Sequence, residues 1–64
     1  MIIKGIISSI DEQNKMIEVI LPEYGNIVTK PLNVYHTIEF DTLSVNDFVL
    51  VVIFNNDFND GIVI

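Results

Sequence analysis

The chain has 64 residues and a formal net charge of −6, with nine acidic side chains against three lysines and no arginine. Because binding to a nucleic-acid backbone relies on clustered Lys and Arg, this balance argues against a nucleic-acid partner. The absence of cysteine and the presence of only one histidine exclude a disulfide framework and the usual Cys/His zinc sites. We therefore expect a single domain over residues 1–64 without a metal or cofactor.

Half of the residues are hydrophobic and the mean hydropathy is +0.50, which is high for so small a domain. A chain of this length buries too little of its own surface to be more than marginally stable. Without a disulfide or a metal, association between copies is the common remaining source of stability, so the composition predicts an apolar subunit interface. No apolar run reaches the roughly 18 residues of a membrane-spanning helix. Residues 1–4 do not begin a signal peptide, so we expect a cytoplasmic product.

The first half of the chain predicts a β-hairpin followed by a loop. Apolar residues of both parities from Ile2 to Ile10 indicate a strand that bends near Gly5, because an internal glycine often marks a bulge. Residues 11–15 form a polar turn, and Met16 to Leu21 is the returning strand. We expect one face of this second strand to enter the core, namely Ile17, Val19 and Leu21. The combination of proline, glycine and asparagine in residues 22–26 predicts a loop.

The next stretch predicts a third strand from Ile27 to Tyr35 and then the longest irregular segment, from His36 to Asp47. Pro31 cannot donate a ladder hydrogen bond, so it should lie at an edge or a bulge of the third strand. The residues expected to point inward on this strand are Val28, Leu32 and Val34. We expect the apolar residues of the irregular segment to plug the barrel, although the spacing of two of them also fits a short strand: Ile38, Phe40, Leu43 and Val45.

The most strongly apolar stretch is Phe48–Phe54, seven consecutive hydrophobic residues between turn-forming residues. Side chains of a strand alternate between two faces, so a strand that is apolar on both faces must be covered on both. One cover is the domain's own core, and the other is predicted to be a partner subunit. A turn over residues 55–61 and a short strand over residues 62–64 complete the pattern. Five short strands without a helical period predict an all-β, small, antiparallel barrel.

Candidate catalytic and metal-binding residues are few, and each has a simpler structural interpretation. His36 has no nearby nucleophile and no third group to orient it, so we interpret it as a loop residue. Glu39 and Asp41 would share one face of a strand, but paired-carboxylate chemistry needs a desolvated cleft, so we interpret them as solvated. Residues 55–61 resemble a calcium loop only superficially, because Phe58 would occupy a ligand position and the final Glu is missing. A tight turn explains the same residues.

Aromatic residues offer one further candidate, a platform on which bases could stack. The residues concerned are Tyr24, Tyr35, Phe40 and Phe58. Because no basic residues are interleaved with them, packing in the core and at an interface is the better interpretation. We therefore find no signature of an enzyme.

The order of several short motifs along the chain resembles a known family. The motifs are Lys4-Gly5-Ile6-Ile7-Ser8-Ser9-Ile10-Asp11, Met16-Ile17-Glu18-Val19-Ile20-Leu21-Pro22-Glu23-Tyr24-Gly25, Leu43-Ser44-Val45-Asn46-Asp47-Phe48-Val49-Leu50-Val51-Val52-Ile53-Phe54 and Asn59-Asp60-Gly61-Ile62-Val63-Ile64. In this order they resemble the N-terminal OB-fold of phage baseplate assembly protein V, and the similar barrels of tail-spike hub proteins and type VI secretion spikes. The resemblance implies a five-stranded OB-fold-like barrel.

The resemblance also implies a structural role in the baseplate of a contractile tail, either of a phage or of an R-type bacteriocin. There the barrel would form a homotrimeric collar that joins the hub to the spike and contacts other baseplate proteins. Its location would be the bacterial cytoplasm during assembly and afterwards the virion or bacteriocin tail. Asn46 stands where the family often has glycine. Spike proteins continue beyond the barrel into a β-helix and a piercing tip, so we expect no membrane insertion by this chain alone.

We predict that the trimer interface uses one face of Phe48–Phe54 together with residues of the first strand. The predicted interface residues are Ile3, Ile7, Phe48, Leu50, Val52 and Phe54. Two alternatives stay open. One is an OB domain that binds an oligonucleotide or an oligosaccharide. The acidic charge of the chain argues against the oligonucleotide. The other is a protein-binding adaptor outside any tail, which pairs through an exposed strand edge.

Overall fold

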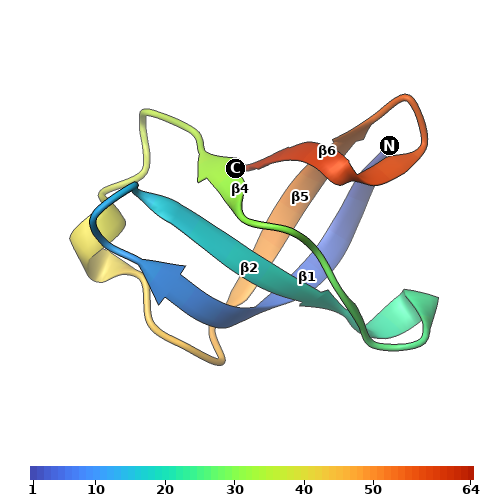
Figure 1. Ribbon diagram of the computed structural model, residues 1–64, viewed down its shortest axis with the longest axis horizontal. Helices are drawn as coiled ribbons and strands as arrows, with labels where there is room; N and C mark the ends of the chain where they lie inside the picture. Colours follow the sequence, from blue (N-terminus) through green and yellow to red (C-terminus); the bar gives the residue numbers. More distant parts are fainter.

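Six β-strands and two single-turn 3₁₀ helices make up the fold, and the computed structural model describes all residues from 1 to 64 (Figure 1). No segment is α-helical, and no helix is long or apolar enough to cross a membrane. The elements in chain order are β1 (Ile2–Asp11), β2 (Met16–Leu21), η1 (Pro22–Tyr24), β3 (Ile27–Val28), β4 (Leu32–Val34), η2 (Phe40–Thr42), β5 (Phe48–Phe54) and β6 (Asp57–Val63).

Five of the strands close into a ring in the order β1–β5–β6–β4–β2 and back to β1, and β3 extends β2 outside this ring. The all-β, five-stranded OB-fold-like barrel predicted from the sequence is confirmed. One pairing differs from the expected antiparallel pattern, because β4 and β6 run parallel and the barrel is therefore mixed. These two strands meet over a short register, Asn33 with Ile62 and Val34 with Val63.

Strand β1 closes the ring because it pairs with two different neighbours along its length. Its first half, Ile2–Ile6, pairs with β5, and its second half, from Ile6 onward, pairs with β2. Gly5 of β1 packs closely on β2, because a Cβ atom there would overlap Cγ1 of Val19. The irregularity in the ladder itself lies a little further along, between Ile7 and Ser9. Glycine therefore permits close packing of β1 on β2, while the bulge bends the strand.

The core lies inside the ring and is entirely aliphatic. Each ring strand contributes at least one buried side chain, and together these are Ile3, Ile7, Ile17, Val19, Leu21, Leu32, Val51, Ile53 and Val63. The inward face predicted for β2 is confirmed, since Ile17, Val19 and Leu21 are at most 1% exposed. Strict alternation along β2 follows from the period of two of an extended strand.

The third predicted strand is broken into β3 and β4, with Pro31 in the gap between them. Thr29 lies in that gap and bonds to Val19 of β2. The Val19 amide donates to Oγ1 of Thr29 at 3.2 Å, and the Thr29 amide donates to the Val19 carbonyl at 2.9 Å. A side-chain hydroxyl thus replaces a ladder carbonyl where the proline interrupts pairing. The expectation for Val28 is wrong, because its side chain is 53% exposed, whereas Leu32 is buried as predicted.

The hairpin of β5 and β6 turns over only two residues, Asn55 and Asn56, and Phe54 pairs directly with Asp57. Both asparagines have a φ angle of 55°, which a two-residue turn of type I′ requires and which Asn tolerates better than most residues. The expected turn over residues 55–61 is therefore wrong in extent. The ladder shifts register before Ile53 pairs with Gly61, so the intervening residues bulge away from β5.

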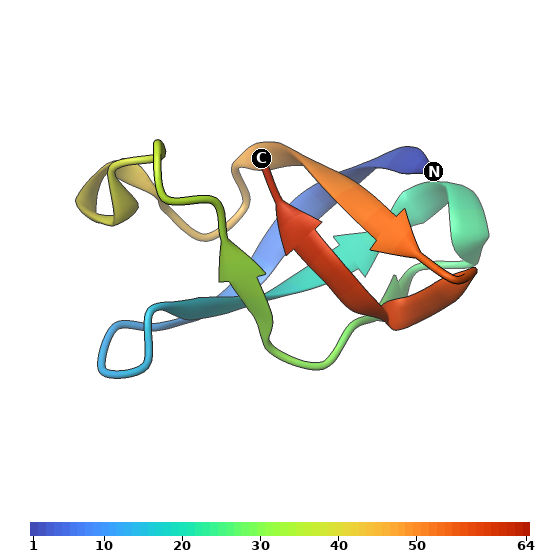
Figure 2. The ribbon, with the colours of Figure 1, turned by 90° about the horizontal axis from the view of Figure 1, so that it is seen from above.

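The connection from Tyr35 to Asp47 covers one end of the barrel, beside the turn between β1 and β2 (Figures 1 and 2). Ile38, Phe40 and Leu43 are partly buried and pack against the core, which agrees with the predicted plug. Val45 does not take part, since it is 50% exposed. The alternative prediction of a short strand through Ile38 and Phe40 is wrong, because Phe40 begins the 3₁₀ helix η2.

Candidate functional site

The two faces of β5 lie in different surroundings although both are apolar. Val51 and Ile53 point into the core and are 0% and 3% exposed. The side chains of the other parity point away from the barrel, and Phe48, Leu50 and Phe54 are 72%, 48% and 46% exposed. Monomeric proteins rarely leave a contiguous apolar surface uncovered, so this second face is the leading candidate for a binding surface.

Strand register extends this surface onto the neighbouring strands. Ile2 on β1 and Ile62 on β6 both pair with Val52, and they form one row across three strands. Cross-strand partners present their side chains on the same face of a sheet, so these rows are contiguous. We call the resulting surface the outer face, and its residues are Ile2, Lys4, Ile6, Phe48, Leu50, Val52, Phe54, Ile62 and Ile64.

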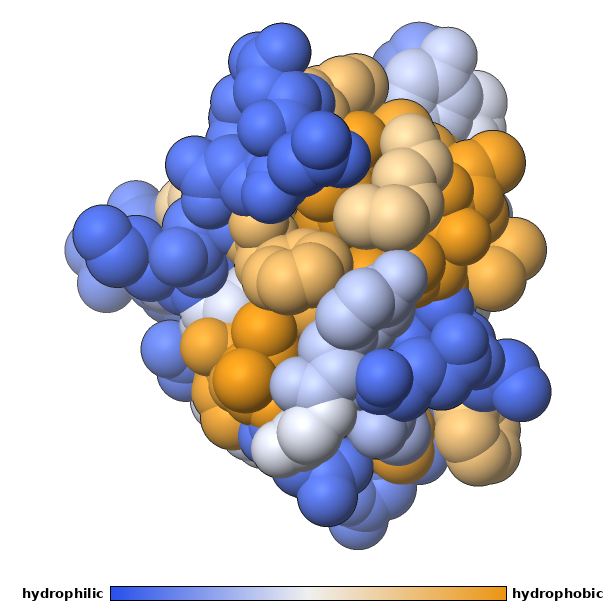
Figure 3. All heavy atoms as spheres, turned by 90° about the vertical axis from the view of Figure 1, so that its right-hand side faces the viewer, coloured by the Kyte–Doolittle hydropathy of each residue, from blue (hydrophilic) through white to orange (hydrophobic).

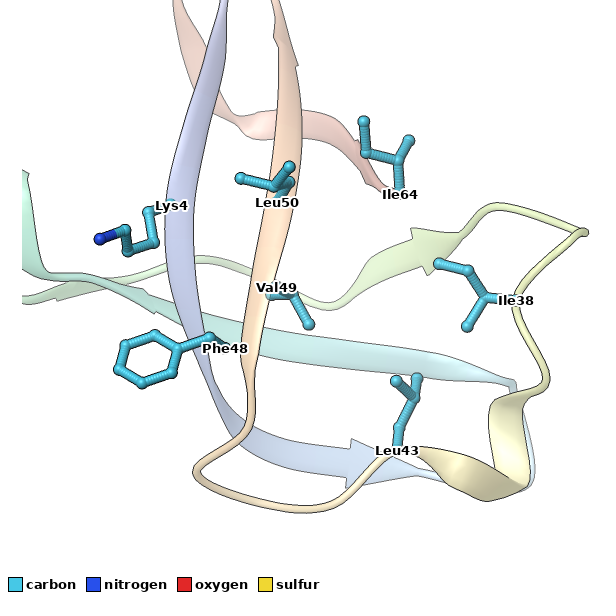
Figure 4. Close-up of a pocket in the computed structure, with 7 residues that line it drawn as sticks. All are labelled: Lys4, Ile38, Leu43, Phe48, Val49, Leu50 and Ile64. Carbon is cyan, nitrogen blue, oxygen red and sulfur yellow. The ribbon is translucent and has the colours of Figure 1, made fainter.

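A shallow groove of about 540 Å³ lies between the outer face and the connection that plugs the barrel (Figure 4). The residues that line it are Lys4, Ile38, Leu43, Phe48, Val49, Leu50 and Ile64. In Figure 4, Leu43 and Ile38 approach from the connection, while Lys4 and Phe48 lie on the other side of β5. Lys4 carries the only charge in this lining, and its Nζ lies 6.0 Å from the centroid of the Phe48 ring. The groove is thus apolar with one cation at its edge.

Hydrophobic side chains remain exposed in the space-filling view of the barrel end that contains the N terminus and the turn between β5 and β6 (Figure 3). Hydrophilic side chains flank them on several sides. The rings of Tyr24 in η1 and Phe58 in β6 contact each other in a tilted arrangement, with their centroids 4.7 Å apart. Met1, next to the start of β1, is 51% exposed. Apolar surface therefore continues from the outer face toward this end of the molecule.

The structure separates the predicted interface residues into two groups. Phe48, Leu50, Val52 and Phe54 lie together on the outer face, and their role in an interface stays a prediction. The expectation for Ile3 and Ile7 is wrong, because they lie in the core at 7% and 0% exposure. Residues of the opposite parity on β1 face outward instead. Because β1 is apolar on both parities, hydropathy does not indicate its inward face, whereas pairing with β5 does.

Sequence reasoning missed five members of the outer face: Ile2, Lys4, Ile6, Ile62 and Ile64. The signal for them is the register of β1 and β6 on β5, which pairs Lys4 with Leu50 and brings the Ile64 amide to the Leu50 carbonyl at 2.9 Å. No local sequence pattern encodes this register, since it depends on closure of the barrel.

The residues considered for chemistry lie apart from one another and on exposed backbone. His36 is exposed and its ring lies 4.4 Å from that of Tyr35, centroid to centroid. Glu39 and Asp41 lie exposed at η2, and no group of three His, Asp or Glu side chains gathers at one point. Asp57 accepts a hydrogen bond from the Asn59 amide at 2.9 Å, which is local turn geometry. Nothing here assembles a nucleophile with a base.

The four aromatic residues considered as a platform form no single cluster. Tyr24 contacts Phe58, and Tyr35 contacts His36 with the two rings tilted. Phe40 contacts Lys15, whose Nζ lies 5.0 Å from the centroid of the Phe40 ring. One carboxyl group has a clearly altered pKa, and it lies at the end of β1. Hydrogen bonds from the side chain and amide of Asn14 hold the pKa of Asp11 below its usual 3.8.

A comparison with protein-family models found no match, and a comparison with curated proteins found none either. The case for a function therefore rests on the geometry of the barrel and its outer face, together with the order of motifs in the sequence.

Proposed function

We propose that this chain is a structural protein of a contractile-tail baseplate, in which copies of the barrel associate into a trimeric collar between hub and spike. The observation that carries the proposal is the outer face, because its apolar rows continue across β1, β5 and β6 and leave large hydrophobic side chains exposed, namely Ile2, Phe48, Leu50, Phe54 and Ile64. Burial of apolar surface at about 25 cal/mol per Å² is the main driving force for association between subunits.

The positions of the recognised motifs in the fold support the same proposal. The Leu21-Pro22-Glu23-Tyr24-Gly25 motif forms the corner at η1, where Gly25 has a φ angle of 75°. The Val45-Asn46-Asp47 motif turns the chain into β5, and Asn46 has a φ angle of 76° where the family often has glycine. Asn accepts this conformation better than most residues, so the substitution keeps the turn. Both segments thus lie where the chain changes direction in the barrel.

The groove beside the outer face favours a second candidate function, a protein-binding adaptor or a ligand-binding OB domain that is not part of a tail. Binding pockets are typically concave and apolar with a few polar groups, and the groove has this character with Lys4 at its edge. In that case the barrel would act as a monomer, and its partner would occupy the groove in place of another copy.

The proposal is tested in particles from the native host. The chain is tagged, contractile particles are purified on a density gradient, and the tag is located by immunogold electron microscopy. We expect gold at the baseplate end of particles that contain sheath and tube, and a signal at no other position. A tag absent from intact particles, or present on a host protein outside them, would contradict the tail assignment and favour the adaptor.

A further inference from the structure

The groove beside β5 has a wall that the fold holds in place. The wall is the connection that plugs the barrel, because Ile38 and Leu43 both line the groove and pack against the core. In Figure 4 these two side chains lie on one side of β5, and Lys4 and Phe48 lie on the other. The volume of about 540 Å³ falls within the range of roughly 300–1,000 Å³ that is typical of small-molecule pockets. The groove therefore has the size and the shape to hold a small ligand.

Lys4 supplies the one charged side chain in the lining of the groove. Its Nζ lies 6.0 Å from the centroid of the Phe48 ring, which places the ammonium beside an aromatic surface. Carboxylates also occur on neighbouring strands, at Glu18 of β2 and Asp57 of β6, but neither lines the groove. Each already accepts a hydrogen bond, one from a serine hydroxyl and the other from a backbone amide. The lining thus presents one cationic side chain and no acidic one.

These features define the chemistry of a ligand that fits the groove. Six hydrophobic side chains favour an apolar body, because binding removes their surface from water. The ammonium of Lys4 favours an anionic group at one end of that body, since an ion pair beside apolar surface is less screened than one in bulk water. The net charge of −6 repels anions from the molecule as a whole, so only a local contact can favour an anion.

We propose that the groove binds a medium-chain alkyl carboxylate, with the carboxylate at Lys4 and the alkyl chain across Leu50 toward Leu43. The proposal rests on the second candidate function, for which it names the ligand class, and it does not depend on the assignment to a tail. Each methylene that leaves water raises the affinity, by up to about fourfold when it is fully buried. Because Phe48 and Leu50 also belong to the outer face, a bound carboxylate and a second copy of the chain would compete for them.

A titration of the isotopically labelled chain, followed by the chemical shifts of its backbone amides, measures the binding. The probes at neutral pH are octanoate, octanol and octylammonium, which share an alkyl chain and differ in charge. We expect octanoate to bind most tightly, with a dissociation constant on the order of 1 mM, and octylammonium to bind most weakly. The shifts should be largest at the groove residues Lys4, Leu43, Leu50 and Ile64. Tighter binding of octylammonium would overturn the proposal, because the overall charge and not Lys4 would then determine the affinity.

Lys4→Met tests the charged end of the groove, because methionine keeps an unbranched apolar side chain and lacks the ammonium. This variant should weaken octanoate binding roughly fivefold, the upper end for a partly exposed ion pair, and should leave octanol binding unchanged. Lys30→Met is the matched control, since it removes the same charge at an exposed position outside the groove. Equal effects of the two lysine variants on octanoate binding would overturn the contact with Lys4.

Leu50→Ser tests the apolar part of the groove, and Val45→Ser is its control. The two residues are 48% and 50% exposed, but only Leu50 lines the groove. Leu50→Ser should weaken octanoate and octanol binding alike, by about threefold or more, while Val45→Ser leaves both unchanged. Circular dichroism of each variant establishes that the barrel is folded.

Two results with the wild-type chain would overturn the groove as a site. One is the absence of saturable shifts at roughly ten times the expected dissociation constant. The other is a set of shifts centred on the contact between Met1 and Tyr24, at the other apolar part of the surface. Either failure leaves the tail assignment and the self-association standing, because immunogold labelling and sedimentation test those directly.

Discussion

The inner and outer faces of β5 are made from the same kinds of residue, yet they lie in opposite surroundings. Val51 and Ile53 are enclosed by the other strands of the barrel, whereas Leu50 and Phe54 are about half exposed on the outer side. The inner face contributes to the free energy of folding as soon as one chain closes its ring. The outer face can contribute only when something else covers it. Hydropathy alone therefore does not distinguish a residue that stabilises the fold from one that forms an apolar binding surface.

The largest change in the free energy of unfolding is expected when an inward-facing isoleucine of β1 is replaced by alanine, and an outward-facing isoleucine of the same strand provides the comparison. Ile7→Ala removes a fully buried side chain and should lower the free energy of unfolding by about 2–5 kcal/mol. Ile2→Ala removes a side chain that is 62% exposed and should change the stability of the monomer by less than about 0.5 kcal/mol. Urea unfolding at low protein concentration measures both, and equal effects would contradict the assigned faces of β1.

A smaller effect is expected from Thr29→Val, which keeps the shape of a buried side chain but removes its hydroxyl. The Val19 amide would lose its acceptor inside the barrel, and an unsatisfied buried donor costs about 1–3 kcal/mol. Thr42→Val is the matched control, because its hydroxyl bonds to the Glu39 carbonyl at an exposed position, and a change below about 0.5 kcal/mol is expected. Thermal unfolding followed by circular dichroism distinguishes the two. Neither change should affect association.

Asn56→Val should destabilise the fold by about 1–2 kcal/mol, because a β-branched residue resists the positive φ angle of the two-residue turn. Asn56→Gly, which is well suited to the second position of a type I′ turn, should be neutral or slightly stabilising. Chemical denaturation of the two variants checks the turn. If Asn56→Val leaves the free energy of unfolding unchanged, the assigned two-residue hairpin is contradicted. The register of β6 on β5, which places Ile62 on the outer face, would then be in error as well.

The smallest effect concerns acid stability through Asp11. Because hydrogen bonds from Asn14 and Gln13 lower its pKa in the folded state, the ionised group favours folding at every pH above its unfolded pKa. That contribution is lost as the pH falls through the folded pKa, below the usual 3.8. Asp11→Ala should therefore lower stability slightly at neutral pH and should flatten the acid limb of the stability curve below about pH 4. Unfolding titrations across that range compare the two chains.

The elements that sequence predicted correctly are those with a local signal. The alternation of β2 identified Ile17, Val19 and Leu21 as core, and the uninterrupted apolar run identified β5. The errors arose where tertiary contacts decide. Strand β1 is apolar on both parities, so only its pairing with β5 reveals that Ile2 faces out and Ile3 faces in. The β5 residues of the outer face were predicted from the apolar run. Its β6 residues were not, because they follow only from the register of β6 on β5.

The turn of β5 and β6 shows a second kind of limit. The sequence indicated a turn somewhere in residues 55–61, because Asn, Asp and Gly are all frequent in turns. Two consecutive positive φ angles at Asn55 and Asn56 shorten it to two residues and lengthen β6 toward its start. The choice among several possible turns in such a stretch depends on which strand pairing closes the ring, and propensity does not contain that information.

The most direct test of the account is the mass of the chain in solution as a function of concentration, measured by sedimentation equilibrium for the wild type, Leu50→Asp and Val45→Asp. Leu50 and Val45 are 48% and 50% exposed, but only Leu50 belongs to the outer face. The account predicts a wild-type mass three times the 7.3 kDa of one chain, the same mass for Val45→Asp, and a folded monomer for Leu50→Asp. A wild-type chain that stays at 7.3 kDa across the micromolar range would contradict it.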